Sequence, residues 1–441
     1  MDFLHYVIAF VFVLGVMVLV HELGHFLAAR YFGVRVEAFA FGFGPRLFGH
    51  KRGDTDYKVC LVPVGGYVKM AGETTQEPTG APGEFLSKPR WQRVVIALMG
   101  PVFNIALALL LLTGLFMIRY ERMAFQLEPA VIGYVAERSA AEQAGIRVGD
   151  TIVAIDGEET PTWEAVRLTE ITAALKTVTV TVEREGARLN LPVAIGVDQT
   201  TGVGKAGWSE IVAVRLGNTV EGMPAEGAGI RDGDILVALN GEEINSPARV
   251  PDLIQQIGGQ PIALEVLRDG RTVSLDVTPV YDESDAAHPA WRIGVELGAQ
   301  YDRIKTRLGF VDAWRESVDQ NTKNASLIFS FLVGLIEQRM SPKSLEGPIG
   351  IARLSGRAAR AGWPQLVMLM AAISLNLGIF NLLPIPILDG GVITLLLMES
   401  VMRRDISFAV KERIVQVGLV CILLLFAFVI YNDIVKSLSS G

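Results

Sequence analysis

Two histidines and a glutamate near the N-terminus have the spacing of a metal-dependent hydrolytic site. They stand in the run His21-Glu22-Leu23-Gly24-His25. On a helix, His21 and His25 share one face one turn apart, so both imidazoles can reach one ion. Zinc held by such groups lowers the pKa of water to about 7, and the neighbouring Glu22 can serve as the general base. The ligand types alone leave iron and cobalt open.

A third ligand is needed, because a catalytic zinc site typically combines three protein ligands with one open position. The candidate is Asp389, in an apolar segment that two prolines, Pro384 and Pro386, interrupt. Proline breaks a helix, and irregular backbone at membrane depth is tolerated only inside protein or along a wet cavity. The alternative is that Asp389 is a polar helix-end residue beside a glycine turn. We expect it to be the third ligand.

The composition indicates membrane spans joined to water-soluble domains. Of 441 residues, 50% are hydrophobic while 20% are charged. Four segments reach the roughly 20 apolar residues that a spanning helix needs: 4–29, 94–118, a broken span from about 366, and 414–431. No basic region precedes the first apolar run, so we expect an uncleaved span. A shorter apolar run at 327–336 follows a polar stretch and predicts an amphipathic interfacial helix within 301–362.

The distribution of Lys and Arg predicts the orientation of the chain. Basic residues gather in the loop between the first two spans, at 30–93, and in the loop at 403–413. Both loops should be cytoplasmic, which places both termini and the region from 119 to about 363 outside the cytoplasm. The expected location is a bacterial inner membrane, with that region in the periplasm and the active site near the cytoplasmic side. A net charge of −7 without any basic block excludes nucleic acid as a partner.

An internal repeat occupies the region outside the cytoplasm. Residues 144–159 recur as 228–243, and each copy predicts a short helix, a glycine turn, a strand and a tight hairpin. The pattern resembles tandem PDZ domains, over 123–210 and 211–300. PDZ folds bind extended peptides by strand addition. The alternative that one or both copies only block access sterically remains open.

The loop after the first span, about 34–72, is expected to form a membrane-associated β-hairpin. Its residues 59–70 alternate as in a strand. An edge strand could pair with an unwound substrate segment, and Gly65 and Gly66 would allow close backbone approach beside Tyr67 and Val68. The alternative is an ordinary cytoplasmic turn.

Three features together resemble the site-2 protease family of intramembrane metalloproteases. They are H-E-L-G-H in the first span, N-x-x-P-x-P-x-L-D-G in a late span, and PDZ-like repeats between them. The resemblance implies a polytopic α-helical membrane protein with four transmembrane helices, two inserted PDZ domains and a membrane core made of 1–122 and 363–441. It implies one zinc ion on His21, His25 and Asp389, with Glu22 as the base and Asn381 contacting substrate or stabilising the transition state. The implied substrate is the transmembrane segment of a single-span protein in the lipid bilayer, such as an anti-sigma factor or a signal-peptide remnant.

Two other classes of protein could carry a histidine pair in a membrane span. A membrane-anchored PDZ adaptor with a structural zinc site would have no use for Glu22 beside the ligands. A metal transporter would distribute ionisable residues through its spans, whereas this chain gathers them in one cluster. Asn104, after Gly100-Pro101, is expected only to help pack the second span against the first. Asn376 is expected to line the cavity or to bridge helices.

Overall fold

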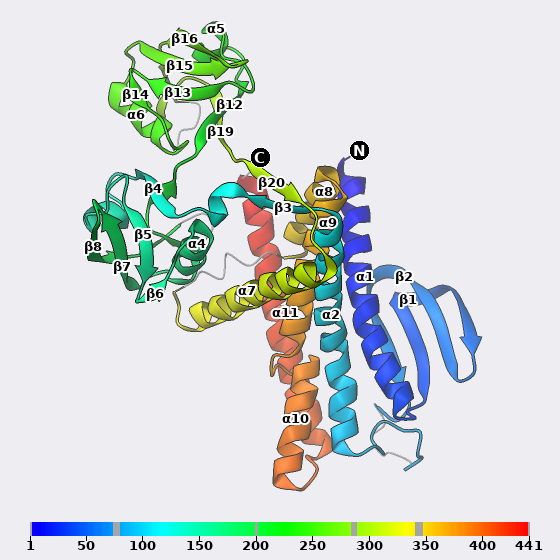
Figure 1. Ribbon diagram of the computed structural model, residues 1–441. Helices are drawn as coiled ribbons and strands as arrows, with labels where there is room; N and C mark the ends of the chain where they lie inside the picture. Colours follow the sequence, from blue (N-terminus) through cyan, green and yellow to red (C-terminus); the bar gives the residue numbers. More distant parts are fainter. Residues whose placement is uncertain (1, 74–79, 199–201, 284–288, 340–346, 440–441) are drawn as a thin grey trace. The chain divides into compact units, whose positions relative to one another are not determined.

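The chain forms two compact units in the computed structural model, which describes residues 2–73, 80–198, 202–283, 289–339 and 347–439 (Figure 1). One unit combines Met1–Tyr120, Thr306–Leu332 and Pro342–Gly441. The other combines Glu121–Lys305 and Val333–Ser341. The two ends of the sequence therefore build one unit together, and the middle of the sequence is an insertion into it.

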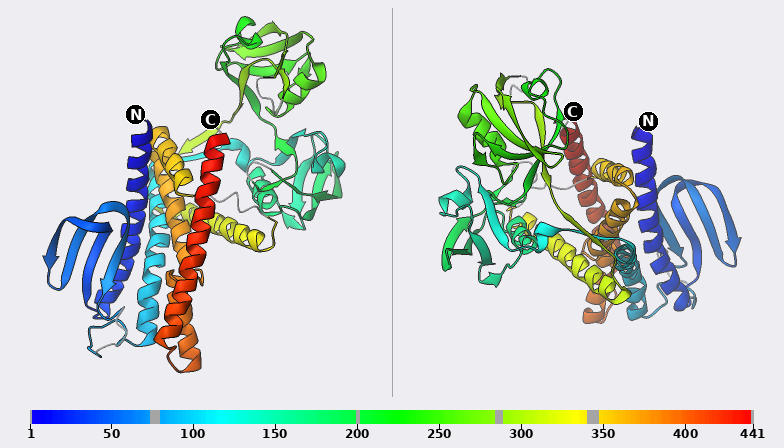
Figure 2. Two further views of the ribbon diagram at one scale, coloured as in Figure 1. Left: turned by 180° about the vertical axis from the view of Figure 1, so that it is seen from behind. Right: turned by 45° about the horizontal axis from the view of Figure 1, so that its top comes forward.

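Four helices among the described residues are long and apolar enough to cross a bilayer, which confirms the predicted number of spans. They are α1 (Asp2–Tyr31), α2 (Arg90–Ile118), α9 (Trp363–Asn381) and α11 (Phe408–Ser439). In α11 only 6% of the most apolar window is buried, against 33–39% in the other three. α1, α2 and α9 therefore form the packed centre and α11 lies at its edge (Figures 1 and 2).

The close packing of α1 on α2 depends on small residues. A Cβ added at Gly24 would lie 2.2 Å from the carbonyl oxygen of Met99, so only glycine lets the two backbones approach this closely. On its other side, α2 is bound to α9 by the Ser374 hydroxyl, which donates to the Asn104 carbonyl oxygen at 2.8 Å. These contacts fix α2 between the helix that carries the histidines and the helix that leads to Asp389.

The break in the late span divides it into α9 and α10 (Asp389–Met402). The intervening loop contains both prolines, and Ile387 has a φ of +87°, a conformation that costs a β-branched residue about 1–3 kcal/mol. A Cβ at Gly390 would lie 2.2 Å from a loop carbonyl oxygen, and one at Gly391 would lie 2.3 Å from another. The loop thus folds tightly over the two glycines and places Asp389 at the first position of a new helix.

The segment after α1 forms a long antiparallel hairpin of β1 (Val36–Arg52) and β2 (Thr55–Met70), joined by a two-residue turn. Residues 36–41 pair with 66–70 on one side, and residues 38–41 pair with 56–59 on the other. Each long strand therefore folds back, and together they make four rows. In the described part of the chain, the row 66–70 pairs on one side only. The alternative of an ordinary turn for residues 59–70 is wrong.

The second unit contains two six-stranded sheets with the same strand order. The first runs β11-β4-β5-β7-β8 with β6 on β5, and the second runs β19-β12-β13-β15-β16 with β14 on β13. Their elements are β4 (Ala130–Val135), α3 (Ala140–Gln143), β5 (Thr151–Ile155), β6 (Glu158–Glu159), α4 (Trp163–Thr172), β7 (Thr177–Arg184), β8 (Ala187–Ala194) and β11 (Trp208–Glu210), then β12 (Ala213–Thr219), α5 (Pro224–Gly227), β13 (Ile235–Leu239), β14 (Glu242–Glu243), α6 (Arg249–Ile257), β15 (Ile262–Arg268), β16 (Arg271–Val277) and β19 (Val295–Gln300). The sequence repeat is therefore also a repeat of topology.

A buried ion pair recurs in both sheets and gives the repeat a physical basis. Asp150 accepts two hydrogen bonds from Arg184 at 2.6 and 2.7 Å, and Asp234 accepts two from Arg268 at 2.8 and 2.6 Å. Each arginine also donates to the carbonyl of the repeated glycine, Gly145 in the first copy. The two aspartates are at most 2% exposed, so the bidentate pairing satisfies carboxylates that are shielded from water.

The remaining elements lie outside the two six-stranded sheets and the four long apolar helices. They are β3 (Tyr120–Met123), which pairs with β20 (Arg303–Thr306), the 3-10 helix η1 (Ala124–Leu127), β9 (Gly196–Val197) with β10 (Gly204–Lys205), β17 (Val280–Asp282) with β18 (Ala290–Arg292), α7 (Phe310–Ile336) and α8 (Pro348–Ala361). The helix predicted around 327–336 is thus the end of the longer α7.

Candidate metal centre

The structure brings His21, His25 and Asp389 together from α1 and α10, with their ligand atoms turned toward one another. His21 Nε2 lies 3.2 Å from His25 Nε2 and 3.0 Å from Asp389 Oδ2, and His25 Nε2 lies 3.4 Å from Asp389 Oδ1. Tetrahedral zinc with bonds of about 2.0–2.1 Å separates its ligand atoms by about 3.3 Å. Both histidines are buried, so the donor set and its spacing fit a zinc ion.

The two imidazoles are oriented from behind by α2. His25 Nδ1 lies 2.8 Å from the Ile96 carbonyl oxygen, and His21 Nδ1 lies 3.1 Å from the side-chain amide of Asn104. Between these two contacts, the backbone of Gly100 faces both histidines. A Cβ at Gly100 would lie 2.3 Å from His25 Nε2 and 2.8 Å from His21 Nε2. The space in which the ligand nitrogens converge therefore exists only because residue 100 has no side chain.

A cavity of about 350 Å³ opens onto this centre. Glu22 lines it from α1, and Asn381 lines it from the last position of α9. Tyr67 and Val68 line it from the row 66–70 of the hairpin. The cavity lining is about equally polar and apolar, which suits a space that must admit both water and a peptide.

The row 66–70, which pairs on one side only, lies directly against Glu22. A Cβ at Gly66 would lie 3.4 Å from Glu22 Cγ and 2.9 Å from the Ala40 carbonyl oxygen. The backbone of Val68 is near enough to interact with the Glu22 carboxylate. Neither Gly65 nor Gly66 is among the residues that line the cavity, and Gly65, whose φ is +94°, packs against the Phe43 ring.

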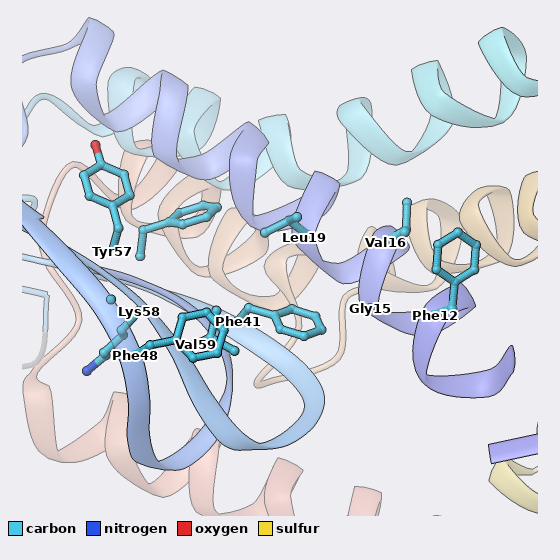
Figure 3. Close-up of a pocket in the computed structure, with 11 residues that line it drawn as sticks. Phe12, Gly15, Val16, Leu19, Phe41, Phe48, Tyr57, Lys58 and Val59 are labelled. Carbon is cyan, nitrogen blue, oxygen red and sulfur yellow. The ribbon is translucent and has the colours of Figure 1, made fainter. Parts of the chain in front are cut away.

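A larger groove of about 520 Å³ lies between α1 and the hairpin (Figure 3). Phe12, Gly15, Val16 and Leu19 line it from the helix, and the hairpin contributes Phe39, Phe41, Phe48, Gly49, Tyr57, Lys58 and Val59. Its surface is almost entirely apolar, and Lys58 is the one charged residue in this lining. The groove offers no acid, base or metal ligand set, so the smaller cavity is the candidate for the chemistry.

Sequence reasoning missed three residues of this region. Asn104 was expected only to pack helices, Gly100 was noted only as part of its motif, and Glu73, which lines the cavity, was not singled out. The interval of four residues from Gly100 to Asn104 was the available signal, because it puts both on one face of α2. Asn376 is exposed and is not among the residues that line the cavity, so of its two expected roles the bridging of helices stays a prediction.

Known proteins resemble this chain over nearly its whole length. The model of peptidase family M50 matches residues 9–425. The Regulator of sigma-E protease RseP of Salmonella typhimurium (strain 14028s / SGSC 2262) is 33% identical over 444 residues, covering 96% of this chain and 97% of the relative. The protein of the same name from Escherichia coli (strain K12) is 31% identical over 454 residues, covering 98% and 99%.

One solved structure is similar to about a fifth of the chain. The PDZ domain of the SdrC-like protein from Listeria monocytogenes is 16% identical, covers 20% of this chain and 90% of its own, and gives a TM-score of 0.18. The family assignment therefore depends on the matches over the full length, which also include the region of the metal centre. The chain belongs to peptidase family M50, the site-2 protease family of zinc metallopeptidases.

Proposed function

We propose that this protein hydrolyses a peptide bond within the transmembrane segment of single-span membrane proteins, with one zinc ion held by His21, His25 and Asp389. The observation that carries the proposal is the convergence of His21 Nε2, His25 Nε2 and the two oxygens of Asp389, with contacts of 3.0–3.4 Å, beside Glu22 in one cavity. A structural zinc site is closed by a fourth protein ligand. It therefore has no open position and no use for a carboxylate beside one. The competing adaptor function has no use for that arrangement.

The roles of the residues follow from their positions. Zinc, when bound by these three residues, supplies a Lewis acid that activates water and polarises a carbonyl group. Glu22 takes a proton from the attacking water and passes it to the leaving amine, which requires a carboxylate in the cavity within reach of both. The Asn381 amide reaches the same cavity and donates a hydrogen bond to the substrate carbonyl oxygen, where negative charge develops.

The hairpin supplies the means of holding substrate extended. A helical segment hides its carbonyl groups in its own backbone bonds, so it must unwind before hydrolysis. The row of Gly66, Tyr67 and Val68 has an unpaired side next to Glu22, and we infer that the unwound substrate pairs with it as an additional strand. Gly65 contributes indirectly, because its positive φ allows β2 to turn into that row. Because this substrate comes from a transmembrane segment, we propose that the hairpin is associated with the membrane.

The orientation predicted from basic residues has support in one contact. Arg90, at the start of α2, forms an ion pair of 2.8 Å with Asp405, in the loop between α10 and α11. The two basic loops therefore meet at the same end of the helices, as two cytoplasmic loops must. His21 and His25 lie in the second half of α1, toward this end. We infer that the active site is near the cytoplasmic side and the β-rich unit is in the periplasm.

The inserted region is proposed to select substrates. The two sheets with equal topology fall in 123–210 and 211–300, and we assign both as PDZ domains, followed by an interfacial helical segment at 301–362. The membrane core is 1–122 with 363–441. The relatives named Regulator of sigma-E protease support an anti-sigma factor as substrate, with signal-peptide remnants as a second group. The PDZ domains would either bind a newly exposed C-terminus or exclude untrimmed substrates by size.

The test is cleavage of a model single-span substrate by purified protein in detergent, for wild type and Glu22→Gln, with bound zinc measured in both. We expect stoichiometric zinc in both proteins and cleavage only in wild type, because the amide keeps the shape of the side chain but cannot accept a proton. Equal cleavage by both proteins would refute the role of Glu22. A wild type that holds no zinc and cleaves nothing would favour the PDZ adaptor.

A further inference from the structure

The side chain of Asn104 meets a proposed metal ligand from the far side of its ring. Asn104 is 0% exposed, and its amide lies 3.1 Å from His21 Nδ1, while the other ring nitrogen, Nε2, faces Asp389 at 3.0 Å. No other side chain among the described residues forms a hydrogen bond with Nδ1 of either histidine. The contact therefore goes beyond the packing of one span on another.

The two ring nitrogens of His21 have opposite requirements. A neutral imidazole carries one proton, and the nitrogen that binds a metal must be free of it. If Nε2 binds the ion, the proton is on Nδ1, which then needs a hydrogen-bond acceptor. His25 shows the same arrangement, because its Nδ1 faces the carbonyl oxygen of Ile96, a group that can only accept.

Asn104 can satisfy this requirement only with its oxygen. The amide oxygen Oδ1 accepts, the nitrogen Nδ2 donates, and a half turn of the amide exchanges the two. With Nδ2 toward the ring, Nδ1 must be unprotonated, and the proton then occupies the nitrogen that should face the metal. With Oδ1 toward the ring, the proton is held on Nδ1 and Nε2 is free. When Nδ2 is the atom toward the ring, Oδ1 is buried and has no hydrogen-bond partner.

We propose that Asn104 is a positioning residue for the metal centre: its amide oxygen accepts the Nδ1 proton of His21 and so fixes the tautomer and ring orientation that bind zinc. This inference rests on the proposed role of His21 as a ligand. Groups that orient metal-binding histidines typically contribute about 10- to 100-fold to metal affinity. Substitution of Ile96 leaves the backbone carbonyl that faces His25 in place, whereas substitution of Asn104 removes the group that faces His21.

The experiment measures zinc affinity by competition with a chelator, on the full-length protein in detergent. Asn104→Leu keeps the number and branching of the side-chain heavy atoms and removes the acceptor, so we expect zinc binding about 10- to 100-fold weaker than in wild type. Asn104→Asp keeps an oxygen in place and should bind zinc within a few-fold of wild type. Ser374→Ala is the matched control: it removes the hydrogen bond to the Asn104 carbonyl, and with it a buried α2–α9 contact, but touches no ligand.

The outcomes separate positioning from packing. Weak zinc binding confined to Asn104→Leu supports the proposal, and wild-type affinity in that variant would overturn it. Equal loss of affinity in Asn104→Leu, Asn104→Asp and Ser374→Ala would also overturn it, because all three would then act through helix packing. His21→Ala tests the metal site itself: if that variant binds zinc as tightly as wild type, the proposed site is wrong, whatever Asn104 does.

Discussion

Replacing Gly100 with alanine should empty the metal centre without touching a ligand. The added methyl carbon would lie 2.3 Å from His25 Nε2 and 2.8 Å from His21 Nε2, whereas ordinary contact begins at 3.4 Å. The His25 ring must therefore move by about 1 Å, while zinc sites hold their ligand distances to within about 0.2 Å. The helix cannot absorb the clash by a side-chain rotation, because a methyl group has none. We expect zinc affinity to fall by at least about 100-fold, with cleavage below about 1% of wild type.

The measurement is zinc content of the purified protein, together with cleavage of a single-span substrate. Gly114→Ala, on the same helix, is the matched control because no atom lies within 4 Å of its added Cβ. That substitution should leave zinc and cleavage unchanged and should stabilise the helix by up to about 1 kcal/mol. Thermal unfolding of chelator-treated preparations distinguishes loss of metal from loss of fold. Stoichiometric zinc and wild-type cleavage in a folded Gly100→Ala protein would refute the placement of the metal between the histidines.

Two further predictions test the substrate side of the cavity and the ion pairs of the insertion. Asn381→Ala should retain zinc and lose about 10- to 100-fold in kcat, because it removes a donor that acts on the reacting carbonyl; a change confined to KM would contradict that role. The Arg268 guanidinium lowers the pKa of Asp234 below its ordinary value of 3.8. The ion pair of Asp234 should therefore stabilise the fold fully above pH 3.8 and lose this effect as the pH falls below that value. Asp234→Asn should remove this part of the acid dependence of unfolding, measured by circular dichroism.

Local sequence patterns were sufficient to predict the long apolar helices, the repeated fold and the histidine pair. Apolar runs of spanning length located α1, α2, α9 and α11, because the bilayer fixes the required length. The repeated Gly-Asp segments predicted two similar folds because each aspartate pairs within its own copy, as Asp150 does with Arg184. The interval of four residues between His21 and His25 implied a shared helix face, which the ligand distance of 3.2 Å matches.

Features that depend on long-range geometry were not accessible in the same way. The folding back of β1 and β2 into four rows depends on turns within each strand, and the alternation of residues 59–70 alone does not reveal it. The approach of Gly66 to Glu22 and the strained φ of Ile387 depend on how separate segments pack. Glu73 could be assigned to the cavity only after the hairpin was placed against α1.

The face of α2 toward α1 shows how one helix supports both histidines of the other. Ile96, Gly100 and Asn104 recur every four residues on α2, the same interval that separates His21 from His25 on α1. Since the two helices run in opposite directions, the earlier α2 position meets the later histidine: Ile96 contacts His25 and Asn104 contacts His21. Gly100 falls between the two contacts, where the proposed zinc ion would bind. A hydrogen-bond acceptor at each end and a glycine in the middle are therefore the requirements for a helix that supports a histidine pair of this spacing. Leucine at position 104 would bury the helix equally well and leave His21 without its partner, whereas any residue at position 96 keeps the carbonyl that faces His25.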